Sequence, residues 1–364
     1  MNKIRKRVSI IGTQGVPASY GGFETLVENM IGENASEEIE YTVFCSSKDI
    51  SPELTEYKGA KLRYIPLRAN GMQSIPYDML SMIKAARNCD VLLVLGVSGC
   101  LALPFFRPFF RKRLIINIDG LEHRRAKWGK LARWILRTSE AMAVRYADVI
   151  VSDNKGIQDY VTETYSKPSE LIAYGGDHVL RDLSEERQNE ILTGMGLTSS
   201  DYCFTVCRIE PENNCHLILE SFARTGKKLM FVGNWERSEY GRQLKEKYSS
   251  FPNILISDPI YDIDVLYALR RNCLAYIHGH SAGGTNPSLV EAMFFGVPIV
   301  AFDVVYNRET TGNKALYFSD SSSLSDLMDS SRVTAKVGED MKEHAERNYL
   351  WKTIAAQYES LYQA

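Results

Sequence analysis

Residues 277–303, IHGHSAGGTNPSLVEAMFFGVPIVAFD, join a glycine-rich loop to a helix that carries a carboxylate. Asn286 and Pro287 are typical of an N-cap and a first helical residue, so the helix should begin there. The loop before it would present the free amides of Gly283, Gly284 and Thr285. Such amides favour phosphate oxygens, and Glu291, about one turn into the helix, could accept hydrogen bonds from a ribose diol. The alternative is a solvated loop beside an exposed helix glutamate.

A glycine pair also stands at the start of a helix near the N-terminus. The stretch GTQGVPASYGGFET, residues 12–25, follows a short apolar strand and leads into a helix with apolar side chains on one face. Gly21 and Gly22 would let an anion approach bare backbone amides. A dinucleotide-binding loop is the competing interpretation, but the G-x-G-x-x-G spacing is missing, which argues against a nicotinamide enzyme.

Arg208 lies in VCRIEPENN, residues 206–214, directly after another apolar strand. Its guanidinium always carries charge and offers five donors, which suits a pyrophosphate leaving group. The alternative is a structural ion pair with Glu210 or Glu212.

Acid–base groups cluster in INIDGLEHRR, residues 116–125, at the end of a further strand. A carboxylate at Asp119 could assist an incoming hydroxyl or stabilise positive charge on a transferred sugar. Glu122 and His123 are close enough in sequence to share that site. Alternatively, Asp119 and Gly120 form only a turn.

Neither of two possible metal motifs is convincing. Asp262 and Asp264 form a D-x-D, but they stand where a helix should begin, so we interpret them as helix-capping residues. Cys203, Cys207 and Cys215 have no zinc-ligand spacing. We therefore predict no metal site.

Strand-like and helix-like segments alternate along the whole chain, which predicts parallel α/β sheets. With 364 residues, two doubly wound domains are expected, each with its ligand-binding loops at the carboxyl ends of its strands. We place the first domain at 1–175 and the second at 176–345. The last helix is expected from about 339 to 362, and residues from about 345 to 364 should pack back on the first domain. One Rossmann domain with an unrelated cap is the alternative.

Composition narrows the class of protein. A net charge of −2 argues against general nucleic-acid binding, and seven cysteines without framework spacing are best explained as free thiols in a reducing cytoplasm. The basic N-terminal segment precedes too short an apolar run for a signal peptide, and no stretch has the ~20 apolar residues of a membrane span. We expect a cytoplasmic protein.

Three stretches together resemble the retaining family-4 glycosyltransferases, which have the GT-B fold of two Rossmann-like domains facing a cleft. EAMFFGVPIVA matches the donor-binding signature of that family, and GTQGVPASYGGFET with NIDGLEHRRAKW is similar to its bacterial rhamnosyltransferase subgroup. The resemblance gives Glu291 the role of the second signature glutamate, which holds the ribose, and Arg208 that of a diphosphate ligand. Gly21 and Gly22 would approach the same diphosphate.

The sequence departs from the family at three positions. The first signature glutamate falls on Gly283, a lysine expected five residues after Arg208 is Asn213, and relatives carry a histidine near Asp119. These departures leave open whether the sugar contacts, or catalysis itself, are those of the family.

The resemblance implies transfer of L-rhamnose from dTDP-β-L-rhamnose, with retention of configuration, to a lipid-linked saccharide in cell-surface polysaccharide synthesis. It implies no cofactor and no divalent metal. Two alternatives stay open: another donor such as UDP-glucose, or a catalytically inactive nucleotide-sugar-binding protein.

Aromatic and basic residues interleave at 105–113 and 124–140. Trp128 and Trp134, with the lysines and arginines around them, are typical of a helix lying on an anionic membrane. We therefore expect a peripheral protein on the inner face of the cell membrane, attached through its acceptor-binding first domain. Ordinary packing with a solvated basic face is the alternative.

Overall fold

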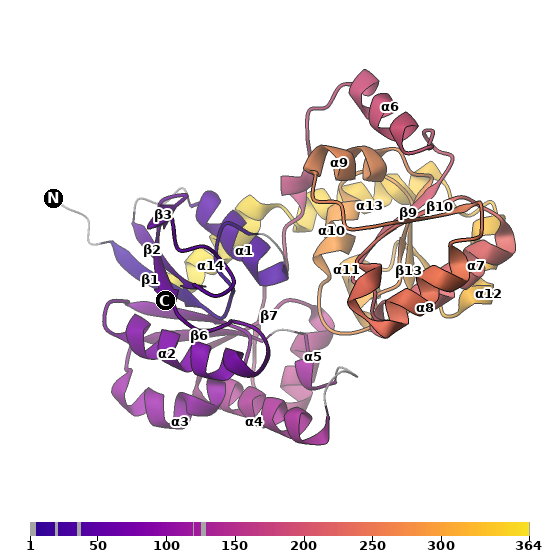
Figure 1. Cartoon of the computed structure of the whole chain (residues 1–364). Coiled ribbons are helices and arrows are strands. Elements are labelled where there is room, and N and C mark those ends of the chain that lie inside the picture. Colours follow the sequence, from indigo (N-terminus) through magenta and orange to yellow (C-terminus); the bar gives the residue numbers. More distant parts are fainter. Residues whose placement is uncertain (1–4, 19–20, 35–37, 119, 125–128, 364) are drawn as a thin grey trace. The chain divides into compact units, whose positions relative to one another are not determined.

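The computed structural model describes residues 5–18, 21–34, 38–118, 120–124 and 129–363, and these form two compact units (Figure 1). The first unit comprises Met1–Tyr174 and Trp351–Ala364, and the second Gly175–Leu350. The sequence predicted boundaries at 175 and 345, with the chain end added to the first domain.

The first unit is built on a sheet that is parallel except for one short edge strand. Its strand order is β3-β4-β2-β1-β5-β6-β7-β8, and only β3 runs antiparallel, against β4. The central strands are runs of valine, isoleucine and leucine because helices cover both faces. The strands are β1 (Lys6–Ile11), β2 (Ile39–Ser46), β3 (Glu56–Tyr57), β4 (Ala60–Ile65), β5 (Val91–Leu95), β6 (Arg113–Ile118), β7 (Val149–Ser152) and β8 (Glu170–Leu171).

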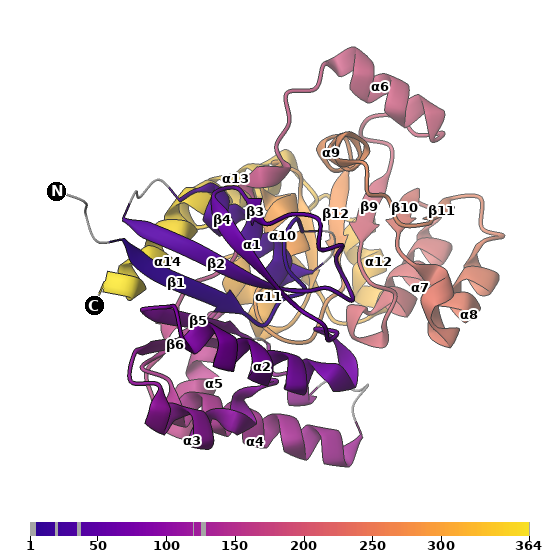
Figure 2. The ribbon, with the colours of Figure 1, turned by 60° about the vertical axis from the view of Figure 1, so that its left-hand side comes forward.

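Helices α1 and α14 lie side by side against this sheet, and α2, α3 and α4 cover its other face (Figure 2). Helix α1 buries the stripe of Leu26, Val27, Met30 and Ile31 that its sequence period predicts. The helices are α1 (Gly22–Gly32), α2 (Ser74–Ala86), α3 (Leu103–Phe106), α4 (Lys130–Tyr146), α5 (Lys155–Tyr165) and α14 (Trp351–Gln363), and the 3-10 helices are η1 (Gly71–Gln73), η2 (Cys100–Ala102), η3 (Arg107–Phe109) and η4 (Glu122–Arg124).

The second unit is a parallel sheet in the order β11-β10-β9-β12-β13-β14. Numbered from its own first strand, this is the order 3-2-1-4-5-6 of dinucleotide-binding folds, in which the chain reverses its winding between the first and fourth strands. Here that switch point lies between β9 and β12. The strands are β9 (Cys203–Val206), β10 (Leu229–Val232), β11 (Ile254–Ser257), β12 (Ala275–His278), β13 (Ile299–Phe302) and β14 (Leu316–Phe318).

Polar side chains begin several helices of this unit. Ser184, Ser238, Asp262, Asn286 and Asp320 each accept a hydrogen bond from an amide in the first turn of the helix that follows. The helices are α6 (Glu185–Gly194), α7 (Cys215–Thr225), α8 (Glu239–Tyr248), α9 (Ile263–Arg271), α10 (Pro287–Met293), α11 (Val305–Thr310), α12 (Ser321–Asp329) and α13 (Ala335–Asn348), and the 3-10 helices are η5 (Asp177–Val179), η6 (Pro211–Asn213) and η7 (Trp235–Arg237).

The single helix predicted for residues 339–362 is wrong. The chain forms α13, then breaks at Tyr349 and Leu350, then forms α14. Helix α13 packs on α10 and β13 of the second unit, whereas α14 packs on α1 of the first, so one straight helix could not serve both cores. The two chain segments that pass between the units run beside each other, since the Gly176 amide donates to the Tyr349 carbonyl at 2.9 Å.

Candidate functional site

The switch point of the second unit brings two sequence-predicted loops together. One follows β9 and carries Arg208 and Asn213, and the other follows β12 and carries Gly283. Asn213 is buried and joins them: its Nδ2 donates to the Arg208 carbonyl at 2.7 Å, and its Oδ1 lies 2.6 Å from Nδ1 of His280. Asn213 therefore does not take the place of a lysine that would contact a ligand, because its side chain contacts groups of the two loops instead.

Backbone contacts hold the same two loops closely. The Ser281 amide and hydroxyl both donate to the Glu212 carbonyl, at 2.8 and 2.9 Å. A Cβ on Gly279 would lie only 2.1 Å from the Asn213 carbonyl oxygen, so only glycine fits there. From α11, buried Asn307 donates to the carbonyls of His280 and Phe302. The carboxyl edge of β9 and β12 is thus fixed before any ligand arrives.

Arg208 lies half-buried at this edge with its charge available. Among the described residues its guanidinium has no hydrogen-bond or ion-pair partner. In particular, no ion pair joins it to Glu210 or Glu212, the alternative that the sequence left open. An arginine that the fold leaves uncompensated is suited to an anionic ligand.

The start of α10 has the predicted local structure. Asn286 is its N-cap, with Oδ1 accepting from the Ser288 amide at 3.0 Å, and Pro287 is its first residue. Gly284 and Thr285 are buried, and Gly283 has φ +74°, a conformation that side chains rarely adopt. The missing signature glutamate at Gly283 is therefore accompanied by a backbone conformation that disfavours glutamate at that position.

Glu291 is not an exposed helix residue. Its side chain is only 15% exposed, and Oε2 accepts from Arg270 Nη2 at 2.5 Å. His178, from η5, places Nε2 3.6 Å from Oε1 of the same carboxylate. Burial, before any other influence, lowers the pKa of His178 below its ordinary value, so the ring is neutral at pH 7. Arg270 and His178 had no signal of their own in the sequence, because their partner is distant along the chain.

At the first-unit loop, the structure gives Gly21 an internal role. Gly21 has φ +126°, and a Cβ there would lie 2.0 Å from Oε2 of Glu24. That carboxylate is buried, and its Oε1 accepts from Thr13 Oγ1 at 2.9 Å and from the Gln14 amide at 2.8 Å. A protein carboxylate thus already lies at the end of α1 where Gly21 and Gly22 were expected to receive a diphosphate. Binding of an external anion there stays a prediction.

The acid–base cluster is partly described. Asp119 lies outside the described residues, and Glu122 lies in η4. His123 places Nδ1 3.0 Å from Oε2 of Glu140, a fully buried residue of α4. Oε1 of Glu140 accepts from the hydroxyls of Tyr160 and Tyr165, each at 2.7 Å. Burial alone would raise the pKa of Glu140, but the hydrogen bonds from His123, Tyr165 and Tyr160 outweigh it and hold that pKa below its ordinary value.

The predicted capping role of the D-x-D motif is confirmed for Asp262. Asp262 caps α9, with Oδ1 accepting from the amides of Asp264 and Val265 at 2.9 and 3.2 Å. All seven cysteines are free thiols, and Cys207 and Cys215 lie 3.8 Å apart, sulfur to sulfur. Within the described ranges, no group of three or more histidine, cysteine or carboxylate side chains is arranged to hold a metal ion.

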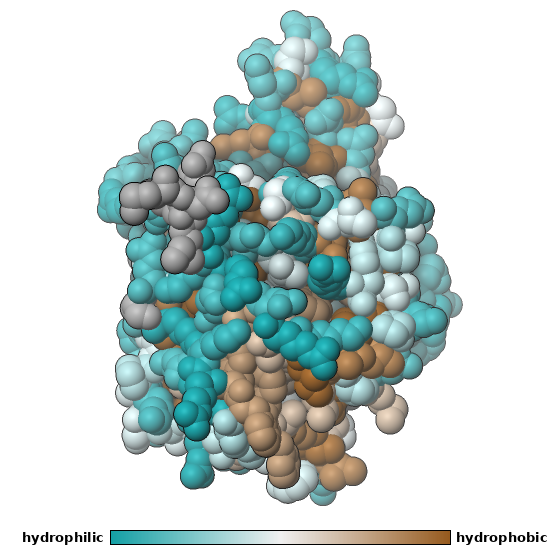
Figure 3. Space-filling view, turned by 90° about the vertical axis from the view of Figure 1, so that its left-hand side faces the viewer, coloured by the Kyte–Doolittle hydropathy of each residue, from teal (hydrophilic) through white to brown (hydrophobic). Residues whose placement is uncertain are grey.

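The aromatic and basic stretches divide into buried and exposed parts. Arg107 pairs with Asp148 and donates to two carbonyls, so it is structural, whereas Phe105 and Phe109 are 80% and 91% exposed. Figure 3 shows apolar side chains gathered near the lower edge of the first unit, where Figure 1 places α2, α3 and α4. Trp128, Arg125 and Lys127 lie outside the described residues. None of the described helices is long and apolar enough to cross a membrane.

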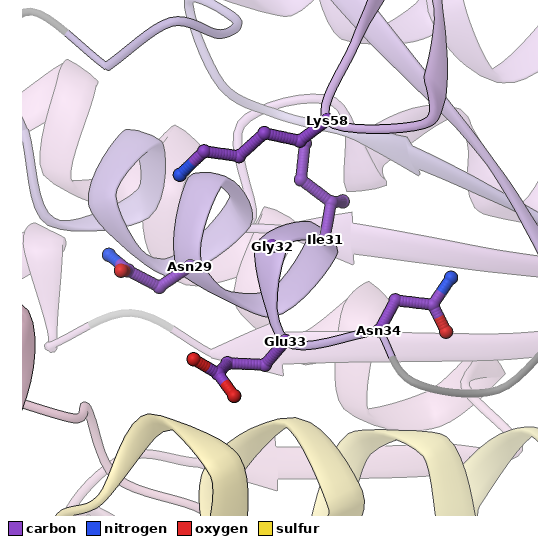
Figure 4. A pocket seen from close by; sticks show the side chains of 6 residues that line it. All are labelled: Asn29, Ile31, Gly32, Glu33, Asn34 and Lys58. Atoms are coloured by element: carbon purple, nitrogen blue, oxygen red, sulfur yellow. The ribbon is translucent and has the colours of Figure 1, made fainter.

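Two pockets in the described part of the chain lie away from these loops. Six residues at the C-terminal end of α1 and in the turn at Lys58 line an open depression of about 410 Å³ (Figure 4). Another, of about 510 Å³, lies at the amino ends of β9 and β10, beside Asp201 and Lys228. Ligands of doubly wound sheets bind at the carboxyl ends instead, so neither pocket is the candidate site.

Comparison with known protein families gives a match within the second unit. Residues 197–333 match the family described as glycosyl transferases group 1. The chain carries a glycosyl transferase group 1 domain. Residues 5–177 match a domain of unknown function, DUF1972. No curated protein matches the chain by sequence.

Solved structures show the fold of the whole chain. Sucrose-phosphate synthase from Thermosynechococcus elongatus is 15% identical, with a TM-score of 0.80 over 99% of this chain and 98% of that one. Anabaena HepE in complex with UDP-glucose is 14% identical, with a TM-score of 0.77 over 99% and 100%. The catalytic domain of starch synthase IV from Arabidopsis thaliana, bound to ADP and acarbose, is 12% identical, with a TM-score of 0.72 over 99% of both. The predicted GT-B fold, with two Rossmann-like units, is confirmed.

Proposed function

We propose that this glycosyltransferase moves L-rhamnose from dTDP-β-L-rhamnose, with retention, to a lipid-linked saccharide in cell-surface polysaccharide synthesis. The observation that supports it most is the switch point of the second unit, where an uncompensated arginine lies on a fixed loop and the carboxylate of Glu291, oriented by Arg270, lies on the helix that follows the other loop. Glu291 would hold the ribose hydroxyls and Arg208 the diphosphate. The rhamnosyl donor rests on the resemblance of three sequence stretches to the rhamnosyltransferase subgroup.

In the reaction that we propose, an acceptor hydroxyl oxygen attacks the anomeric carbon on the face that the diphosphate leaves. The bond from that carbon to the phosphate oxygen breaks with its electron pair, and the hydroxyl proton passes to the departing diphosphate. Arg208 stabilises the charge that develops on the diphosphate, so no metal ion is required. Asp119, Glu122 and His123 would act on the acceptor side.

A second donor stays open because one structure of similar fold, Anabaena HepE, was solved in complex with UDP-glucose. The buried position of Asn213 and the left-handed backbone at Gly283 also mean that the donor contacts differ from the family pattern at two places. An inactive nucleotide-sugar-binding protein would share the same loops.

A panel of nucleotide sugars separates these possibilities. Purified protein is incubated with dTDP-rhamnose, UDP-glucose and other nucleotide sugars, with membranes of the native host as the acceptor source, and release of nucleoside diphosphate is measured with and without EDTA. We expect turnover with dTDP-rhamnose that EDTA leaves intact. Turnover only with UDP-glucose would replace the donor, and binding without turnover would establish a scaffold. Activity abolished by EDTA and restored by Mg²⁺ would overturn the metal-independent mechanism.

Glu291→Gln tests the ribose contact in the same preparation. We expect affinity for both dTDP and dTMP, measured by calorimetry, to fall by about 1–3 kcal/mol, the scale of a lost charged hydrogen bond. Glu220→Gln, at an exposed pair with Arg224, is the control and should bind as wild type. Unchanged affinity would leave Glu291 as a structural partner of Arg270.

Attachment to anionic membranes belongs to the same proposal. On α4, Lys130, Arg133, Trp134 and Arg137 recur at i, i+3, i+4 and i+7 and are exposed, so they share one face. Helix α3, with exposed Phe105, packs against α4. We name the following exposed residues the basic-aromatic surface: Phe105, Phe109, Lys130, Leu131, Arg133, Trp134 and Arg137. Apolar rings for the interface and cations for anionic headgroups are what such a surface supplies.

A further inference from the structure

Glu140 of α4 carries a carboxylate that is buried, whereas a glutamate on a helix surface is solvated. It lies on the face of α4 that also buries Ser139, Ala143 and Val144, and this face otherwise carries small or apolar side chains. A carboxylate there is costly unless it is hydrogen-bonded on both oxygens. Glu140 meets that condition through three donors that come from two other elements, η4 and α5.

The two carboxylate oxygens of Glu140 have different partners. Tyr160 and Tyr165, both from α5, occupy Oε1, whereas Oε2 faces Nδ1 of His123 alone at 3.0 Å. An ionised carboxylate only accepts, and the three contacts together keep the pKa of Glu140 low, so the proton of this contact belongs to His123 Nδ1. In the neutral form of a ring that carries its proton on Nδ1, the lone pair is on Nε2.

Nε2 is the only ring nitrogen of His123 still able to accept. The side chain is 12% exposed, and among the described residues Nε2 has no partner. The ring of Tyr160 lies 6.1 Å from that of His123, centroid to centroid, and the carboxylate holds the other edge. The orientation of the His123 ring is therefore set by Glu140 of α4 and Tyr160 of α5.

We propose that Glu140 is a positioning residue that, with Tyr160 and Tyr165, fixes His123 so that Nε2 accepts a hydrogen bond from a hydroxyl of the acceptor saccharide. The inference rests on the proposed function, since it takes a sugar acceptor as given, but it adds a residue that neither the sequence motifs nor the comparisons indicate. It assigns the 5–177 region, matched only to a domain of unknown function, a neutral polyol ligand rather than an anionic one.

The tautomer of His123 can be observed without any substrate. The chain has six histidines, so nitrogen-15 NMR of the imidazoles gives a tractable spectrum, and His123→Gln assigns the signal. We expect Nδ1 to carry the proton and Nε2 to be bare in the wild type at neutral pH. A proton on Nε2 would overturn the proposal directly.

A double-mutant cycle tests positioning against mere structure. The variants are Glu140→Gln, His123→Gln and the two combined, assayed for transfer from the donor that the nucleotide-sugar panel identifies, at limiting and saturating amounts of host membranes. We expect each single variant to lower the rate at limiting membranes by about 10- to 100-fold, as loss of a histidine-orienting carboxylate does at metal sites. The double variant should be no slower than His123→Gln, while dTDP affinity stays at the wild-type value.

Asp148→Asn is the structural control, because Asp148 holds Arg107 and the Leu114 amide in the same unit without facing His123. It should lower the melting temperature and keep the wild-type rate. Multiplicative losses in the cycle, or a Glu140→Gln variant that is less stable but as active as wild type, would overturn the inference and leave the proposed function standing. If no nucleotide sugar is turned over, the proposed function fails and the acceptor role of His123 fails with it.

Discussion

The carboxyl ends of the two sheets differ in the charge that they leave available. In the first unit, the buried carboxylate of Glu24 accepts hydrogen bonds from the loop after β1, and that of Glu140 accepts from two tyrosines of α5 and contacts His123. In the second unit, the neutral side chain of Asn213 joins the loops, and the Arg208 guanidinium has no partner within the described residues. The two doubly wound units thus differ: the first holds two buried carboxylates, and the second has an uncompensated cation in addition to the carboxylate of Glu291, which is paired with Arg270.

The difference indicates how two substrates of unlike charge could each bind to a different unit. An anionic diphosphate is attracted to an uncompensated guanidinium and repelled by a carboxylate, whereas sugar hydroxyls gain from groups that accept hydrogen bonds. The second unit is therefore the better place for a nucleotide sugar and the first for a saccharide. The following variants test this contrast.

Asn213→Lys should have the largest effect. The substitution restores the lysine of the family pattern, but it places an ammonium where the buried amide joins Arg208 and His280. We expect the free energy of unfolding in urea to fall by about 3–5 kcal/mol, with no gain in turnover. Asn348→Lys, at an exposed helix end, is the matched control. A stable and more active Asn213→Lys protein would show that the second unit tolerates a second cation.

Arg208→Ala should remove charge stabilisation where the diphosphate leaves. We expect kcat to fall by about 10²- to 10³-fold, as for other single donors to a developing anion, with a smaller rise in KM. Arg242→Ala, at an exposed arginine paired with Glu239, should behave as wild type. A change confined to KM would mean that Arg208 binds the ground state only.

Glu24→Gln asks whether an external anion reaches the first unit. Loss of the charged contacts to Thr13 and the Gln14 amide should lower the free energy of unfolding by about 1–3 kcal/mol and leave dTDP affinity unchanged. Glu33→Gln, exposed at the other end of the same helix, controls for charge. If dTDP instead binds more tightly to Glu24→Gln, the diphosphate does approach Gly21 and Gly22, and the contrast between the units fails.

The basic-aromatic surface should give the smallest effect per residue. Lys130, Arg133 and Arg137 each contribute about 1 kcal/mol to binding an anionic vesicle, and salt screens that attraction. We expect the protein to co-sediment with phosphatidylglycerol vesicles at low salt, and the triple glutamine variant to stay in solution while binding dTDP normally. Glutamine at Arg242, Lys245 and Lys247 is the charge-matched control. Wild-type protein that ignores anionic vesicles would favour a soluble acceptor.

The sequence predicts the sheets well because their signal is local. Buried parallel strands are continuous apolar runs, and the helix caps are single polar residues such as Asn286 and Asp262. Strand β14 is harder to predict because its three residues, Leu316–Phe318, give too short a pattern. The break between α13 and α14 was missed because the apolar period continues through it, although the residues on either side serve different cores.

The candidate site is less predictable because its decisive contacts are distant in sequence. Glu291 and Arg270 are 21 residues apart, and Glu140 is matched by residues 17 positions before it and 20 and 25 after it. Sequence motifs led us to predict Glu291 and His123 as site residues, but they did not indicate the groups that contact them. One signal was present: Glu140 falls on the buried stripe of α4, where a carboxylate is costly unless other groups hydrogen-bond to it.

Helix α14 has a consequence for the order in which the chain acquires its structure during synthesis. Trp351, Ile354, Tyr358 and Tyr362 are buried in the core of the first unit, and Tyr358 accepts a hydrogen bond from Asn117 at 2.7 Å. Because a ribosome makes these residues after the second unit, the first unit of the nascent chain cannot complete its own core until the second unit has been made. A fragment that ends at Tyr174 would expose the apolar face that α14 covers, so a chaperone has the longest time to act on this half of the protein.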